Sequence, residues 1–206
     1  MNLGSQCLFQ IAELGSSQQA LTHHTSLTSL KVVRIDSSNK LTYLFPATVA
    51  DSLGQLETLE IFNCLGLEEI IQEAEVSNIS LQSLREVRVD GCNNLTSLSS
   101  LCHGYILENL KKLVIVNCCR LEYTFPTSMA EGLPQLKEIE LENLPQLNGN
   151  DIVLTLPSLQ VLTVKSCPQL TSFFISAKIQ VTFFKFFFFL MDYKLQSSYI
   201  TIIVFM

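Results

Sequence analysis

The chain has 206 residues, of which 48% are hydrophobic and 16% are charged, with a formal net charge of −6. This hydrophobic fraction is enough for a buried core and excludes wholesale disorder. The acidic balance argues against a nucleic-acid partner, because phosphates require a basic face.

Residues 1–26 match no clear unit, although Leu8, Ile11 and Leu14 have helical spacing. We interpret this segment as a degenerate or truncated preceding repeat. The chain does not begin with a basic region followed by an apolar one, so no secretory signal is expected. Seven cysteines, an odd number, exclude a complete disulfide framework, and reduced thiols fit a cytoplasmic location.

An internal repeat fills residues 27–175. Residues 53–67 read LGQLETLEIFNCLGL, and residues 81–95 repeat the frame as LQSLREVRVDGCNNL. Six units begin 26, 28, 26, 26 and 23 residues apart, close to the period of leucine-rich repeats. The unit starts are Leu27, Leu53, Leu81, Leu107, Leu133 and Leu156.

Each unit carries one short strand in which two apolar residues flank an outward-facing one. A unit this small cannot bury its apolar side alone, so stacking completes the core. We therefore predict an α/β leucine-rich-repeat solenoid, with a curved parallel sheet on the concave face and short helices, 3₁₀ turns and loops on the convex face. The inward pairs are Val33/Ile35, Leu59/Ile61, Val87/Val89, Leu113/Ile115, Ile139/Leu141 and Leu162/Val164.

The segments that return from one strand to the next differ in kind. Residues 44–53 (LFPATVADSL) resemble residues 124–133 (TFPTSMAEGL), and Pro46 and Pro126 suit the first turn of a short helix. Residues 148–155 have little helical signal, so an irregular or 3₁₀ return is expected there.

Residues 176–206 form a hydrophobic tail outside the repeat. Its run FFKFFFFLM (residues 183–191) is well short of the roughly 20 apolar residues that span a membrane, so a membrane anchor is not expected. We interpret the tail as an atypical or artefactual C-terminus that would be an aggregation hazard in water. Both ends suggest a fragment of a longer protein.

The repeated L-x-x-L-x-x-L-x-I-x-x-C-x-x-L-x-x-L frame and the two Phe-Pro returns resemble plant intracellular immune receptors. The similarity is to the C-terminal repeats of coiled-coil-type nucleotide-binding leucine-rich-repeat disease-resistance proteins, and it covers residues 27–175. LPQL (133–136) and CPQL (167–170) are also typical of these proteins. The G-x-x-x-x-G-K-[ST] phosphate loop is missing, so the nucleotide switch is absent from this chain and no cofactor is expected.

The resemblance implies a sensing and autoinhibitory module that is not an enzyme. Its partner would be a pathogen effector, a host protein or a nucleotide-binding domain missing from this chain. A substrate adaptor of a ubiquitin ligase is the alternative, although no F-box is visible. A membrane-receptor ectodomain would require asparagine at the cysteine position and a Gly-x-Ile-Pro return, and neither occurs.

The outward-facing strand residues would line the concave face, where such solenoids bind proteins. Phe62, Val114 and Val116 are expected as exposed apolar residues rimmed by charge, which is typical of an interface. Glu138, Glu140 and Glu142 on one strand would favour a basic partner. A purely solvated face is the competing interpretation. The candidate face comprises Arg34, Asp36, Glu60, Phe62, Arg88, Asp90, Val114, Val116, Glu138, Glu140, Glu142, Thr163 and Lys165.

No catalytic or metal site is expected. Cysteines 64, 92, 118 and 167 recur in register at the unit corner, which indicates small buried residues that pack the turn rather than a reactive thiol. His23, His24 and His103 lack acidic or cysteine neighbours at ligand spacing. No pairing of a nucleophile with a base emerges.

Overall fold

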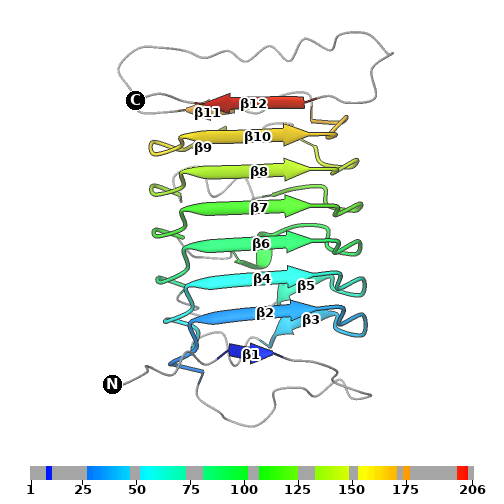
Figure 1. The fold of residues 1–206 in the computed structure, drawn as a ribbon, viewed down its shortest axis with the longest axis vertical. Coiled ribbons are helices and arrows are strands. Elements are labelled where there is room, and N and C mark those ends of the chain that lie inside the picture. The colour runs from blue at the N-terminus through cyan, green and yellow to red at the C-terminus, as the bar shows by residue number, and fades with distance from the viewer. Residues whose placement is uncertain are drawn as a thin grey trace.

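The repeats fold into a stack of parallel strands. A computed structural model of the chain describes residues 8–10, 27–46, 52–72, 81–101, 107–124, 133–148, 153–170, 174–176 and 199–203. The main sheet has eight strands in the order β1-β2-β4-β6-β7-β8-β10-β12 (Figure 1). Their bounds are Leu8–Gln10 (β1), Val32–Asp36 (β2), Thr58–Phe62 (β4), Glu86–Asp90 (β6), Lys112–Val116 (β7), Glu138–Glu142 (β8), Val161–Lys165 (β10) and Tyr199–Ile203 (β12).

The six repeat strands pair in parallel and without slippage from β2 to β10. Val33, Leu59, Val87, Leu113, Ile139 and Leu162 form one continuous row of register partners. Such a constant register places each apolar pair directly above the next one, so the units bury one another's hydrophobic sides. The predicted leucine-rich-repeat solenoid is confirmed.

Among the described residues, the return side carries short strands and one 3₁₀ turn. β3 (Tyr43–Phe45) pairs in parallel with β5 (Glu69–Ile71), and β9 (Val153–Thr155) pairs in parallel with β11 (Phe174–Ser176). In the unit that follows β5, the 3₁₀ helix η1 (Ser99–Leu101) lies beside it. Ser100 Oγ accepts hydrogen bonds from the backbone N–H groups of Ile70 and Ile71, at 3.2 and 3.3 Å. A buried hydroxyl thus satisfies amides at the edge of β5.

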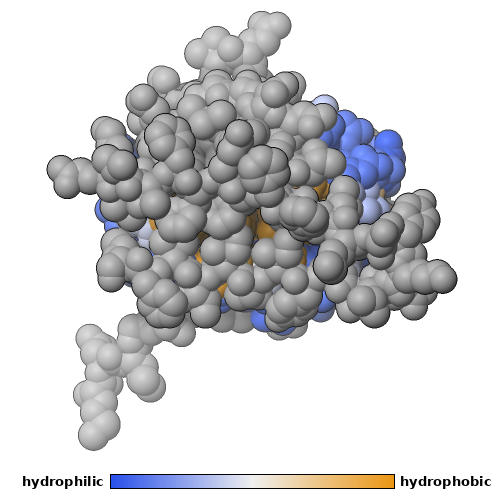
Figure 2. Space-filling view, turned by 90° about the horizontal axis from the view of Figure 1, so that it is seen from above, coloured by the Kyte–Doolittle hydropathy of each residue, from blue (hydrophilic) through white to orange (hydrophobic). Residues whose placement is uncertain are grey.

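The core runs through the middle of the stack between these two sides. In the second unit, Leu53, Leu56, Leu59, Ile61 and Cys64 are all at least 99% buried, and the other units repeat the pattern. Figure 2 looks along the stack and shows apolar residues in its middle and hydrophilic residues at the rim. A single hydrophobic column therefore holds the units together.

Each of the six repeat strands is directly followed by a residue in the left-handed backbone conformation. The positions are Ser37, Asn63, Gly91, Asn117, Asn143 and Ser166, with φ between 51° and 71°. Asparagine and glycine tolerate this region better than other residues do. The chain then makes a tight turn, such as the one closed by the bond from Leu67 N–H to the Cys64 carbonyl at 3.1 Å.

Several sequence expectations concern the return segments and the two ends of the chain, and the structure tests some of them. The helices expected after Pro46 and Pro126 lie largely outside the described residues. The expectation of an irregular or 3₁₀ return over 148–155 is wrong at its end, because Val153–Thr155 form β9, where β-branched residues find a parallel partner strand. Leu8–Gln10 form β1 and pair in parallel with β2, while Ile11 and Leu14, the other two residues with helical spacing, lie outside the described residues. Within the tail, Tyr199–Ile203 form β12.

Candidate functional site

The candidate site is the outward-facing side of the main sheet, which we call the strand face. It consists of the first, third and fifth residues of the six repeat strands. Along five of these strands the second and fourth residues are buried and the other three are partly or fully exposed. Because parallel pairing is in register, these outward residues form three straight rows across the stack.

Twelve of the thirteen candidate residues fall into two of these rows, and Glu138 lies in the row of first strand residues. In the structure these residues lie side by side on the strand face. The central row is Arg34, Glu60, Arg88, Val114, Glu140 and Thr163. The row at the strand ends is Asp36, Phe62, Asp90, Val116, Glu142 and Lys165.

Phe62 is the centre of a stack on the N-terminal half of the strand face. The guanidinium carbon of Arg34 lies 4.6 Å from the Phe62 ring centroid, and that of Arg88 lies 5.7 Å from it. Arg34 is also held by Glu60 at 3.0 Å, and Arg88 by Asp90 at 3.7 Å. The expectation of an exposed apolar Phe62 is corrected, because its half-buried ring is flanked by two cations that bind its electron-rich faces.

Val114 does not belong to the accessible surface. The sequence places it in the central row, but its side chain is 0% exposed. It lies in register between Arg88 and Glu140, whose longer side chains can cover a valine across neighbouring strands about 4.8 Å apart. Val116, one row away, is half-buried. The apolar patch expected from Phe62, Val114 and Val116 is therefore not an open one.

The three carboxylates of β8 lie on the C-terminal half of the strand face and differ in their surroundings. Lys112 Nζ lies 3.1 Å from Glu138, and Lys165 Nζ lies 3.2 Å from Glu142. Between them, Glu140 has no cation within ion-pair distance among the described residues, and its register neighbours are Val114 and Thr163. Within the described residues, Glu140 is thus the carboxylate of this strand without an ion-pair partner, and it is partly exposed.

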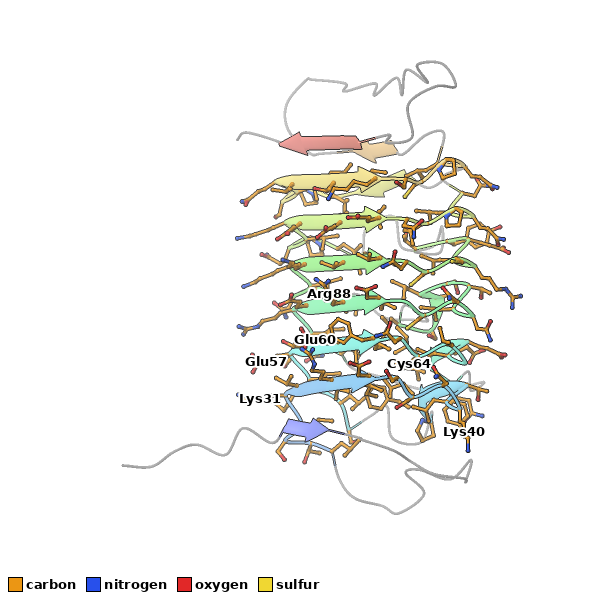
Figure 3. The ribbon with its side chains drawn as sticks, turned by 45° about the vertical axis from the view of Figure 1, so that its right-hand side comes forward. Lys31, Lys40, Glu57, Glu60, Cys64 and Arg88 are labelled. Atoms are coloured by element: carbon orange, nitrogen blue, oxygen red, sulfur yellow. The ribbon has the colours of Figure 1, made fainter. Side chains whose placement is uncertain are left out.

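A second line of charges runs along the strand starts. Glu57 lies 3.1 Å from Lys31 on one side and 4.0 Å from Arg85 on the other. Lys31 and Glu57 are seen at one end of adjacent strands, and Cys64 and Lys40 at the other (Figure 3). These exposed pairs contribute little stability, so their main effect is on the electrostatic pattern that a partner meets.

Polar side chains border the strand face where the strands end. Asp36 accepts hydrogen bonds from the Ser37 hydroxyl at 2.8 Å and the Asn63 amide at 3.3 Å, and these bonds hold the pKa of its carboxyl below the usual value. Asn117 donates to Asp90 at 3.0 Å. The hydrogen bonds that stabilise the ionised form keep Asp36 negative.

The cysteines at the unit corner are buried and pack the turn, as predicted. Cysteines 64, 92, 118 and 167 are free thiols within the core. Each thiol donates to the carbonyl of the residue two positions earlier, for example Cys118 to Val116 at 3.3 Å. Burial raises the pKa of Cys118 to about 12, so its thiol stays protonated and unreactive. Cys119, its neighbour in sequence, is exposed.

The described part of the chain offers little for other kinds of chemistry. It contains no group of three or more histidine, cysteine, aspartate or glutamate side chains placed to hold a metal ion. No helix within the described ranges is both long and apolar enough to cross a membrane.

Sequence reasoning did not find the polar border or the Arg34–Phe62–Arg88 stack. The polar border could have been predicted, because Asn63, Asn117 and Asn143 recur at one position of the repeat frame. The Arg34–Phe62–Arg88 stack could not be predicted from the pattern of a single unit, because it joins residues of three successive strands.

Comparisons with known proteins agree with the repeat pattern. A family model described as "Plant disease resistance protein RPS2-like, leucine-rich repeats" matches residues 17–65 and 103–145. A protein of Arabidopsis thaliana described as a probable disease resistance protein is 38% identical over 130 residues. That alignment covers 58% of this chain and 14% of the relative, so the chain corresponds to a small part of the relative's length.

Proposed function

Since this chain carries leucine-rich repeats of the plant disease-resistance family, we propose that it is a non-enzymatic protein-recognition module of an intracellular immune receptor. In this proposal the strand face binds a pathogen-derived or host protein, or the nucleotide-binding domain of the same receptor. The proposed recognition module comprises residues 27–175, and its proposed location is the cytoplasm. The family match favours this role over that of a ubiquitin-ligase adaptor.

The observation that carries the proposal is the arrangement of charge on the strand face. Its N-terminal half has arginines already engaged by Phe62, Glu60 and Asp90. Its C-terminal half presents Glu140, with no internal cation among the described residues, between two carboxylates that do have one. A basic segment of a partner would gain an ion pair at Glu140 without displacing an internal bond, which supports binding there.

The proposal can be tested by affinity capture with the full chain. We expect proteins captured from plant leaf extract by the wild-type chain to be lost when Glu138, Glu140 and Glu142 are changed to glutamine. A matched control changes three exposed carboxylates outside the strand rows, Glu68, Glu108 and Glu122, to glutamine, and so alters the net charge equally.

The outcome is decided by comparing the two triple variants. Proteins retained by the control but lost from the strand-face variant support the proposal. If both variants keep the same proteins, the strand face is not the binding surface. If both lose them equally, the capture reflects net charge alone, and the proposal also fails.

A further inference from the structure

The C-terminal end of the main sheet differs from the rest in strand direction. Every other neighbouring pair in the sheet is parallel, whereas β12 runs antiparallel to β10 (Figure 1). The pairing spans all five residues of both strands, from Val161 with Ile203 to Lys165 with Tyr199. A repeat strand always enters this sheet in the parallel direction, so β12 is not the strand of a further unit.

β12 covers the edge that β10 would otherwise leave open. β10 pairs with β8 along one edge and with β12 along the other. An open edge presents a row of unpaired N–H and C=O groups, which is a template for strands of other chains. The pairing with β12 thus satisfies the backbone groups along the outer edge of β10, which would otherwise be available to strands of other chains.

The composition of residues 199–203 suits strand addition. The sequence Tyr-Ile-Thr-Ile-Ile is entirely β-branched or aromatic and carries no charge, which are the residue types enriched in strands. It contains no proline and no glycine, which would weaken pairing. Such a segment binds an exposed sheet edge mainly through its main chain.

We propose that the outer edge of β10 is a strand-addition site, which β12 fills within the same molecule. The partner that fits this site in trans is residues 199–203 of a second copy of the chain, bound antiparallel. The two occupants exclude one another, so β12 keeps the molecule from associating through this edge. The proposal goes beyond the proposed function and does not depend on it.

The test uses the full chain with one substitution in β12. Val161 N–H donates to the Lys137 carbonyl on the β8 side, so by alternation the N–H and C=O groups of Leu162 and Val164 point towards β12. Ile202 pairs with Leu162 and is therefore a residue of β12 that donates across this edge. Ile202→Pro fixes φ and removes that backbone donor, so it should release the strand. Ile202→Val keeps the backbone and the β-branched shape and serves as the matched control. The probe is a labelled synthetic peptide of residues 197–206, with lysines added at its N-terminus for solubility.

Two results are expected. In Ile202→Pro, the amide hydrogens of Leu162 and Val164 should exchange at least tenfold faster than in the wild type, and the peptide should restore their protection. The wild type and Ile202→Val should keep slow exchange and should not bind the peptide. Unchanged exchange in Ile202→Pro, or equal peptide binding by all three chains, would overturn the proposal.

A second variant covers the case in which Ile202→Pro does not fold. Thr163→Cys combined with Thr201→Cys places two thiols opposite one another, within reach of a disulfide. Under oxidation at low protein concentration, peptide mapping should find this link in a monomer. At high concentration, an equimolar mixture of the two single variants should give some linked dimer. Absence of the intramolecular link would show that β12 does not occupy the edge.

Discussion

Asn143 donates a hydrogen bond to Asn117 over 2.8 Å, although the two residues are 26 positions apart in the chain. Both have a left-handed backbone, with φ of 55° and 54°, and each directly follows a strand of the main sheet. Asn117 in turn donates to Asp90 at 3.0 Å. The backbone conformation that ends each strand therefore also places an amide where it can reach the next unit.

This relationship predicts an order of stability among variants of Asn117. Asn117→Ala should lower the free energy of unfolding by roughly 2 kcal/mol. The variant loses both hydrogen bonds of the Asn117 side chain and places alanine in a left-handed backbone conformation that it tolerates poorly. Asn117→Gly should cost about 1 kcal/mol, because glycine adopts the conformation freely. Urea unfolding measures both values. An equal loss in the two variants would mean that the backbone conformation contributes nothing.

Two substitutions, one in the core and one on the strand face, test which strand positions are buried and which are exposed. Leu59→Ala should cost roughly 2–5 kcal/mol, because Leu59 is fully buried and its removal leaves a cavity. Glu140→Ala should leave thermal melting nearly unchanged, since no ion pair or hydrogen bond is lost within the described structure. Calorimetry of both variants checks this prediction, and the reverse order of melting temperatures would contradict it.

Cys118 predicts a loss of stability at alkaline pH. Burial raises its pKa in the folded protein from an ordinary value of 9.0 to about 12, so the unfolded chain releases the proton first. Its contribution is therefore complete below pH 9 and is lost as the pH rises from 9 to 12, by at most about 1.4 kcal/mol per pH unit. Urea unfolding between pH 7 and 10.5 should show a shallower decline for Cys118→Ala than for the wild type. Identical slopes would refute the assignment.

The adjacent Cys118 and Cys119 should differ sharply in reactivity. Cys119 is exposed, whereas Cys118 is buried and donates its thiol hydrogen to a carbonyl. With a thiol-specific chromogenic reagent on the native protein, Cys119→Ser should lose one fast-reacting thiol. Cys118→Ser should lose none. Loss of a fast thiol in Cys118→Ser instead would show that this turn is open to solvent.

The sequence predicts the fold well because its signal is local and repeated. The apolar pairs such as Leu59/Ile61 alternate with period two inside a constant frame, and each repetition confirms the register of the last. The return strands were missed because Tyr43–Phe45 and Glu69–Ile71 are only three residues long and pair across units. Such pairing has no period within one unit.

The sequence predicted which residues lie on the strand face but not which of them are accessible to solvent. Alternation alone places Phe62 and Val114 on the outside, and the structure agrees that they share that side. Whether a residue on that side is accessible depends on its neighbours from other units. Arg34 and Arg88 flank Phe62, and longer side chains adjoin Val114. These contacts join residues at least 26 positions apart, which periodicity does not describe.

The unequal spacing of the units falls entirely in the return segments. Each repeat strand has five residues and is followed by one left-handed residue, while successive strands begin between 23 and 28 residues apart. Insertions and deletions on the return side therefore leave the strand face on an unchanged grid. Single outward residues can be exchanged at fixed positions, so the strand face can diversify by substitution while the return segments accommodate changes in length.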